Sequence, residues 1–290
     1  MQQFGDTHAL LTVARTAPTL TLTPRSIRGN LMNLGIAGRK AIVCASSRGL
    51  GKACARALAE AGCEVVINGR DAKKLEATAA ELASIAGTKV IAIAADVATP
   101  EGQKALLAAC PEPDILVNNN AGPPMRDFRE LTRAQMIDGV IANMVVAVEL
   151  IQKVIDPMCQ RKFGRIVNIT SGSVKMPLAG LDLSSGARAG LTAFLAGVAR
   201  TVADKNVTIN NILPGAFDTD RLRGMLNKTA EQRGKTAAQV AADRIATIPA
   251  KRFGNPEEFG AACAFLCSTH GGYITGQNLL IDGGTFSGAF

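Results

Sequence analysis

A short segment with two glycines, residues 43–51, contains the first residues whose types and spacing point to chemistry. After a β-branched run it reads Cys44-Ala45-Ser46-Ser47-Arg48-Gly49-Leu50-Gly51, and an alanine-rich stretch follows. Glycines at a strand-to-helix bend let the backbone approach a pyrophosphate, and the start of the helix offers free N–H groups and a partial positive charge. This placement, more than the Gly-x-Gly spacing, predicts a turn that binds a nicotinamide dinucleotide; a plain tight turn is the alternative.

The preference between NAD(H) and NADP(H) is set near the end of the second expected strand. An NAD enzyme normally places a carboxylate there to bind the ribose hydroxyls, whereas this chain has Gly69 and Arg70. Arg48, inside the turn, is a second guanidinium that could bind a 2′-phosphate bidentately. Two cations and no acid favour NADP(H). Asp71 follows directly, and a surface ion pair between Arg70 and Asp71 is the alternative.

The elements that must position these residues follow a βαβ rhythm, because short β-branched runs alternate with alanine-rich stretches from Arg39 onward. The expected strands are residues 40–44, 64–68, 89–94, 114–118, 165–170, 208–213 and 278–281. The expected helices include residues 50–61, 72–85, 134–158 and 187–203. The pattern predicts an α/β fold: a single Rossmann domain with a doubly wound, seven-stranded parallel sheet and helices on both faces.

Composition limits the possible functions. The chain has 290 residues, of which 47% are hydrophobic and 19% charged, enough for one domain with a large core. The net charge is +8, but the basic residues are spread out and aromatic residues make up 4%, which argues against nucleic-acid binding. No run of eighteen apolar residues occurs, so we expect no membrane span. Seven cysteines without Cys-x-x-Cys pairs predict reduced core thiols, a cytoplasmic protein and no metal site.

Residues 1–33 differ in character from the rest of the chain. They are rich in Thr and Pro and carry Arg15, Arg25 and Arg28 against the single acid Asp6. An arginine-rich, acid-poor start is typical of a transit peptide. The alternative, which we favour, is a disordered tail or an upstream-start extension, because Met32 directly precedes residues 33–35 and the first strand. The expected domains are therefore a leader, 1–33, and a Rossmann domain, 34–290.

These segments together resemble the short-chain dehydrogenase/reductase family from Leu34 to the C-terminus. The glycine motif of that family is Thr-Gly-x-x-x-Gly-Ile-Gly, so Ala45 stands in place of its first glycine. The final segments, 252–258, 273–277 and 282–284, are similar to the tail of bacterial 3-oxoacyl-carrier-protein reductases. The resemblance and the turn together imply cofactor contacts at Ala45, Ser47, Arg48, Gly49, Leu50, Gly51, Arg70, Asp96, Val97, Asn119, Asn120, Ala121, Gly122, Arg188, Pro214, Gly215 and Thr219.

The catalytic segment departs from the family, whose members use an Asn, a Ser and a Tyr-x-x-x-Lys pair. The asparagine resembles Asn143 and the serine resembles Ser171. The tyrosine position, thirteen residues after Ser171, is Ser184, and the lysine position is Arg188. In the family the tyrosine protonates the carbonyl oxygen, while the lysine holds the ribose and lowers the pKa of the tyrosine.

This replacement leaves the source of the proton open. A serine hydroxyl is a far weaker acid than a phenol, so Ser184 would act only as a relay. Arg188 keeps the charge that binds ribose and stabilises an oxyanion, but an arginine does not give up its proton. Asp182 is the nearest carboxyl group and would serve if burial raised its pKa. A solvated loop acid is the favoured alternative for Asp182.

We therefore expect an NADP(H)-dependent oxidoreductase that interconverts a carbonyl compound and an alcohol, with 3-oxoacyl compounds among the candidates. The alternative is a catalytically weak or inactive NADP(H)-binding protein or sensor of the same fold. The resemblance implies that residues 221–248 cover the substrate, where Arg221, Arg223 and Lys228 could meet a phosphate or a carboxylate. It also implies a homo-oligomer, a tetramer, built on the small-residue faces of helices 134–158 and 187–203.

Overall fold

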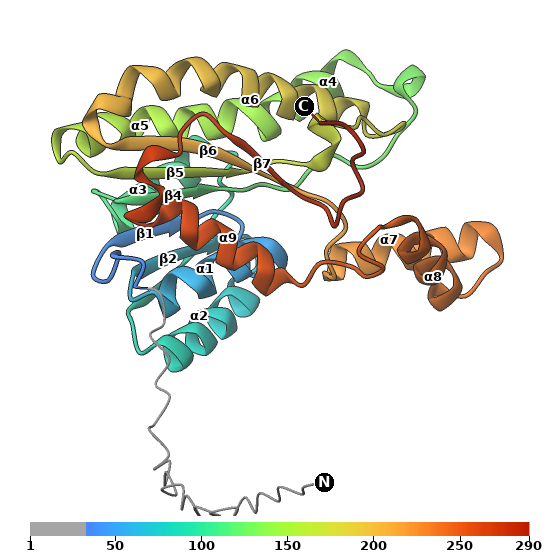
Figure 1. The fold of residues 1–290 in the computed structure, drawn as a ribbon, viewed down its shortest axis with the longest axis horizontal. Helices are drawn as coiled ribbons and strands as arrows, with labels where there is room; N and C mark the ends of the chain where they lie inside the picture. Colours follow the sequence, from blue (N-terminus) through green and yellow to red (C-terminus); the bar gives the residue numbers. More distant parts are fainter. Residues whose placement is uncertain (1–32, 290) are drawn as a thin grey trace, which may run out of the picture. The chain divides into compact units, whose positions relative to one another are not determined.

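A seven-stranded parallel sheet forms the centre of the computed structural model, which describes residues 33–289 (Figure 1). The strands are β1 Lys40–Val43, β2 Glu64–Gly69, β3 Val90–Ala94, β4 Ile115–Asn118, β5 Gly164–Ile169, β6 Val207–Pro214 and β7 Asn278–Ile281. Their order is β3-β2-β1-β4-β5-β6-β7, and every neighbouring pair is parallel. The order reverses between β1 and β4, where a doubly wound sheet opens a crevice at the carboxyl ends of its strands. The leader expected at 1–33 lies, but for its last residue, outside the described residues.

Helices cover both faces of the sheet because the strand side chains alternate between two buried clusters. Ile115 and Val117 pack into one cluster, while Leu116 packs into the other. The first cluster is covered by α1 Gly49–Glu60, α2 Ala72–Ala86 and α9 Pro256–Cys267. The second is covered by α3 Pro100–Ala109, α5 Val146–Gln160 and α6 Asp182–Val202. Figure 1 shows the two helical layers on either side of the strands, and the predicted fold class is confirmed.

The helix expected at 134–158 is interrupted by one turn of a different kind. It consists of α4 Arg133–Val140, a π-helical turn Ile141–Val145 and then α5. A π turn inserts an extra residue into the helix and so rotates the side chains that precede it relative to those that follow. The hydrophobic periodicity of the sequence did not indicate this turn.

The same helix, Arg133–Gln160, is long and apolar enough to cross a membrane when judged by length and composition within residues 33–289. The sequence expectation rested on uninterrupted apolar runs and did not single this helix out. Core helices pass the same test, and Val146, Leu150 and Val154 pack into the buried cluster on the sheet. Length and composition are therefore weak evidence for a span.

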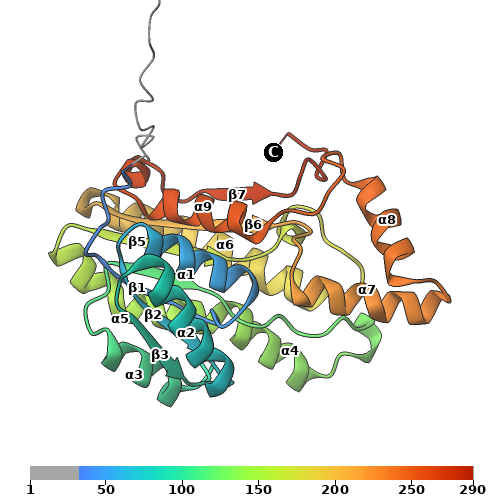
Figure 2. The ribbon, with the colours of Figure 1, turned by 90° about the horizontal axis from the view of Figure 1, so that it is seen from below.

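Two helices beyond the sheet make up the segment expected to cover the substrate. They are α7 Asp220–Arg233 and α8 Ala237–Thr247, each begun by a threonine whose hydroxyl accepts a backbone N–H. A small hydrophobic cluster of Leu222, Leu226 and Val240 joins them. Figures 1 and 2 show both helices, in orange, apart from the helices that cover the sheet.

Candidate active site

The glycine turn after β1 is held by hydrogen bonds from two neighbouring strands. The backbone N–H of Ala45 donates to Oδ1 of Asn68 at 3.3 Å, and Nδ2 of Asn119 donates to the carbonyl oxygen of Ala45 at 3.1 Å. Ala45 adopts a φ of 45°, the left-handed region in which a side chain costs an L-residue about 1 kcal/mol or more. This strain explains why the family motif has glycine there. Asn68, which sequence reasoning missed, also donates to the carbonyl oxygens of Ile93 and Ala95 at the carboxyl end of β3, and so links the turn to the sheet.

The two glycines of the turn are required by close backbone contacts. A Cβ at Gly51 would lie 2.5 Å from the carbonyl oxygen of Ala45, and Gly49 has a φ of 58°. Leu50 lies between them in the first turn of α1, where no side chain caps the exposed N–H groups, since Arg48 at the N-cap makes no capping hydrogen bond. A close backbone cradle with free N–H groups fits a pyrophosphate.

Arg48 and Arg70, the two cations expected to bind the 2′-phosphate, differ in whether an acid lies beside them. Arg48 is exposed and has no ion-pair partner within residues 33–289. Arg70 lies 3.8 Å from Asp96, which follows β3, so a carboxylate from the neighbouring strand lies beside this cation. The suggested pair with Asp71 is wrong, because the Asp71 side chain caps α2 by accepting the N–H of Lys74 at 3.1 Å. The Arg70–Asp96 pair is exposed, and such pairs contribute little energy.

The other predicted cofactor contacts cluster at the carboxyl ends of the strands. Ser47 packs against Gly69, the last residue of β2, and Gly49 faces Thr219 at the N-cap of α7. Pro214 ends β6, and Gly215 follows it within a close contact to Asp282. The remaining contacts follow β3 or β4: Asp96, Val97, Asn119, Asn120, Ala121 and Gly122.

A ladder of asparagine side chains crosses four strands beside these residues. Asn118 donates to Asn168 at 2.9 Å, and Asn168 donates to Asn211 at 3.1 Å. Asn211 in turn donates to Asn278 at 2.8 Å. Each pair also faces across neighbouring strands in register. Sequence reasoning missed this ladder, whose only signal was the presence of asparagine in each of four strands.

The π turn places Asn143 at the inner end of this ladder. Its Nδ2 donates to the carbonyl oxygen of Gly139 at 3.1 Å, which leaves its buried Oδ1 without a partner within the described residues. Oδ1 of Asn118 is likewise buried and unpartnered. Both asparagines line one cavity with Arg188. Buried acceptors of this kind require donors such as ribose hydroxyls, which fits the expected cofactor.

Ser184 and Arg188 are brought together by α6. This helix begins at Asp182, five residues earlier than expected, so Ser184 lies in its first turn and Arg188 one turn later. Nε of Arg188 donates to Oγ of Ser184 at 3.3 Å, and Nη1 donates to the carbonyl oxygen of Ile169 at 2.8 Å. Burial, and then the charge of Arg221, lower the pKa of Arg188 to about 10. The guanidinium therefore remains charged at neutral pH.

Ser171, Asp182 and Tyr273 provide no replacement acid in this structure. Oγ of Ser171 accepts the N–H of Ser173 at 3.1 Å, just after β5. Asp182 is exposed and accepts the N–H of Gly180, as expected for a solvated acid rather than a buried proton donor. Tyr273 is fully exposed after α9. Burial raises the pKa of the Cys44 thiol to about 12, which excludes it as a nucleophile at neutral pH.

Comparisons with known proteins agree with this arrangement. A family model described as enoyl-(acyl carrier protein) reductase matches residues 44–285. The chain is 33% identical over 257 residues to the 3-oxoacyl-(acyl-carrier-protein) reductase of Vibrio cholerae, a match that covers 87% of this chain and 99% of that protein. The chain belongs to the short-chain dehydrogenase/reductase family.

Further members of the family are similar over most of their length. The NADPH-dependent reductase BacG of Bacillus subtilis is 31% identical, with 85% of this chain and 97% of that protein covered. The solved L-sorbose reductase of Gluconobacter frateurii, complexed with NADPH and L-sorbose, superposes with a TM-score of 0.84 at 28% identity, covering 89% of this chain and all of that one. These relatives place the chain among the oxidoreductases and support the use of NAD(P)H.

Proposed function

We propose that this chain is a cytoplasmic, NADP(H)-dependent oxidoreductase that interconverts a carbonyl compound and an alcohol. The observation that carries the proposal is the hydrogen bond to Ser184 from Arg188, a residue that lines the cavity with the asparagines. It sets a hydroxyl and a buried positive charge at the carboxyl ends of β4 and β5, where this fold binds ligands. The domain of this activity is residues 34–290, as the sequence predicts.

The cofactor would be held along the sheet edge that runs from the glycine turn to Arg188. Gly49, Gly51 and the start of α1 would bind the pyrophosphate, and Arg48 with Arg70 would bind the 2′-phosphate. Nη2 of Arg188 has no hydrogen bond within the described residues and would bind the nicotinamide ribose. When bound, NADPH supplies the hydride that reduces the carbonyl carbon and leaves as NADP⁺.

Ser184 would orient the substrate and pass on the proton. Its Oγ accepts from Arg188, which leaves its O–H free to donate to a carbonyl oxygen. The charge of Arg188 would stabilise the negative charge that develops on that oxygen. An aliphatic hydroxyl is a weak acid, so Ser184 would act only as a relay. As its proton passes to the substrate oxygen, Ser184 would take another proton from solvent in the same turnover. Ser171 and Asn143 would hold substrate and water beside it.

Reduction of carbonyl compounds by NADPH tests this proposal. Fluorescence of NADPH reports binding, and its absorbance reports oxidation with a panel of 3-oxoacyl thioesters, diketones and quinones. Ser184→Tyr combined with Arg188→Lys restores the phenol and ammonium of the family, and turnover should rise at least about tenfold. Absence of a gain while NADPH still binds would show that the site no longer admits substrate.

A second function, binding NADP(H) without turnover, is supported by one observation. Within residues 33–289 the only tyrosine is fully exposed and far along the chain from Ser184, so no phenol replaces the missing one. A sensor of this kind would bind NADPH in the fluorescence assay and oxidise none of it with any member of the panel. Oxidation faster than the protein-free reaction would exclude it.

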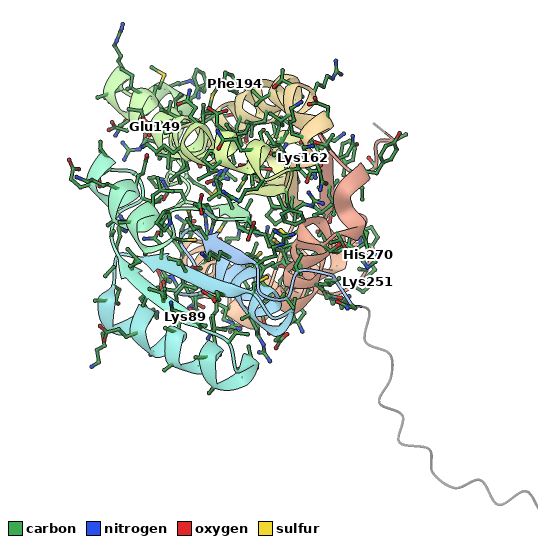
Figure 3. All side chains as sticks on the ribbon, turned by 90° about the vertical axis from the view of Figure 1, so that its left-hand side faces the viewer. Lys89, Glu149, Lys162, Phe194, Lys251 and His270 are labelled. Atoms are coloured by element: carbon green, nitrogen blue, oxygen red, sulfur yellow. The ribbon has the colours of Figure 1, made fainter. Side chains whose placement is uncertain are left out.

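We further propose that the chain forms a homo-oligomer, a tetramer. Large apolar side chains remain exposed on α4, the π turn and α6, namely Met136, Ile137, Val140, Ile141 and Phe194. Phe194 is 48% exposed and lies on the helical layer that α5 and α6 form, away from the strands (Figure 3). Apolar surface of this kind is typical of an interface. A monomer in light scattering would refute the assembly.

A further inference from the structure

Ser184 lines a second cavity, which shares no residue with the asparagine-lined one. This cavity lies between the loop after β4 and the segment that precedes α6, and its lining consists of Pro123, Pro124, Arg126, Leu131, Gly180, Leu181, Leu183 and Ser184. Most of these side chains are apolar, one is a cation, and none is a carboxylate. A cavity of this composition suits a ligand with a small apolar body and an anionic group.

Arg221, on the first turn of α7, also lies near Ser184. A Cβ built on Gly122 would lie 3.2 Å from Nη2 of Arg221 and 3.7 Å from Oγ of Ser184. The guanidinium and the hydroxyl thus lie within 3.7 Å of one point. The positive charge of Arg221 contributes, after burial, to lowering the pKa of Arg188.

The lack of an ion-pair partner for Arg221 among the described residues contrasts with its neighbour Arg223 on the same helix. Arg223, two residues further along α7, pairs with Asp218 at 3.0 Å and Asp220 at 3.3 Å. Arg221 has no ion pair or hydrogen bond from its side chain within residues 33–289. Two guanidinium groups, one of them 93% buried, therefore lie near Ser184, and neither pairs with a carboxylate within the described residues. Like charges held together without a counter-charge destabilise a site, and a bound anion would relieve that repulsion.

We infer that the substrate is a short oxo acid whose carboxylate binds Arg221 while its carbonyl oxygen faces Ser184. This inference rests on the proposed function and names its substrate class. Because Ser184 and Arg221 flank one point, the carboxylate must lie close to the carbonyl, as in 2-oxo and 3-oxo acids. Arginine suits this role, since its planar fork binds a carboxylate through two parallel hydrogen bonds. The apolar cavity beside Ser184 receives the remainder of the chain of the acid.

Phosphates of the cofactor are the other source of an anion near Arg221, and the experiment separates the two. Calorimetry first measures the binding of NADP⁺ to the wild-type protein, to Arg221→Gln and to the matched control Arg223→Gln. Each protein, with and without NADP⁺, is then titrated with 2-oxobutanoate, acetoacetate and the methyl esters of both. The esters keep the carbonyl and the shape but lack the charge.

We expect at least one acid to bind at least about tenfold more tightly than its ester. Arg221→Gln should reduce this preference to less than about threefold and leave NADP⁺ binding unchanged, while Arg223→Gln should keep it. Equal binding of acid and ester, or no binding of either acid, overturns the inference. If Arg221→Gln binds NADP⁺ more weakly and still prefers the acid to its ester, the guanidinium of Arg221 binds the cofactor. That result also overturns the inference. Failure of the wild type to bind NADP⁺ instead refutes the proposed function, whereas the acid-to-ester comparison without cofactor still tests this inference.

Discussion

Replacement of Arg188 by methionine should make the protein more stable while it removes function. Methionine fills a similar volume without charge, so the change isolates the guanidinium. In the structure Arg188 is 93% buried, has no carboxylate partner within the described residues, and faces a second arginine. Replacing such a charge by an apolar side chain of similar volume often stabilises a protein.

The magnitude follows from the pKa of this group. A decrease from 12.5 to about 10 corresponds, at about 1.36 kcal/mol per pH unit, to about 3 kcal/mol of destabilisation by the buried charge. Because the pKa in the folded state lies below that in the unfolded state, this destabilisation is complete below pH 10 and is relieved as the pH rises toward 12.5. Methionine also loses the hydrogen bonds to Ser184 and Ile169, worth about 1 kcal/mol each. The net gain at pH 7 is about 1 kcal/mol.

Urea unfolding at pH 7 without cofactor measures the difference in unfolding free energy between Arg188→Met and the wild type. In thermal unfolding, the melting temperature of the variant should rise by about 2–4 °C. NADPH binding, followed by fluorescence, should weaken at the same time. The matched control is Arg165→Met, also a buried arginine with a pKa lowered chiefly by burial. Arg165 donates to the carbonyl oxygens of Gly164, Asn206 and Ser268, so its loss should cost about 3 kcal/mol or more.

The reasoning would be refuted if Arg188→Met lost 1 kcal/mol or more of unfolding free energy, on the order of one buried hydrogen bond. That result would mean that the hydrogen bonds of Arg188 outweigh the cost of its burial. It would be refuted equally if the two methionine variants changed stability alike, since the contrast rests on their different partners.

Three further predictions concern the hydroxyl, the pH profile and the glycine turn. Ser184→Ala should lower turnover by about 10- to 100-fold in the NADPH oxidation assay, whereas Ser185→Ala, whose hydroxyl bonds only to the Leu181 carbonyl, should stay within about twofold. Because burial lowers the pKa of Arg188 to about 10, this guanidinium, unlike an ordinary arginine, should lose its proton in alkaline solution, and the turnover number should fall as the pH approaches 10. Arg188→Lys should move that fall to lower pH, and an unchanged profile would contradict the role of Arg188. Ala45→Gly should relieve the backbone strain at a φ of 45° and raise the unfolding free energy by zero to about 1 kcal/mol. The gain is small because the greater entropy of the unfolded chain with glycine offsets part of it. A loss of more than about 1 kcal/mol in urea unfolding would contradict this prediction.

Patterns that depend on near neighbours in sequence were predictable. The parallel sheet followed from short apolar strands such as Ile115–Asn118, which are buried on both faces and joined by helices. The glycine turn was recognisable because glycine is required by local backbone geometry, as the contact at Gly51 shows. The i, i+4 spacing of Ser184 and Arg188 would likewise place them on one helix face once α6 was known to begin at Asp182.

Features that depend on contacts distant in sequence were not predictable. Asp96, rather than the adjacent Asp71, pairs with Arg70, because β2 and β3 lie side by side and the Asp71 side chain is used as a helix cap. The π turn at Asn143 leaves no mark in apolar periodicity, since it changes the orientation of side chains and not their order.

The sequence by itself thus determined the fold and the glycine turn after the first strand, because both depend on residue types at short spacing. Only the tertiary structure decided which cations meet at the site. It brought Arg221 from α7 against Gly122 and Ser184, and it gave Arg223 to two carboxylates. The physical reason is that ion pairing depends on distance in space, which chain folding sets and sequence separation does not.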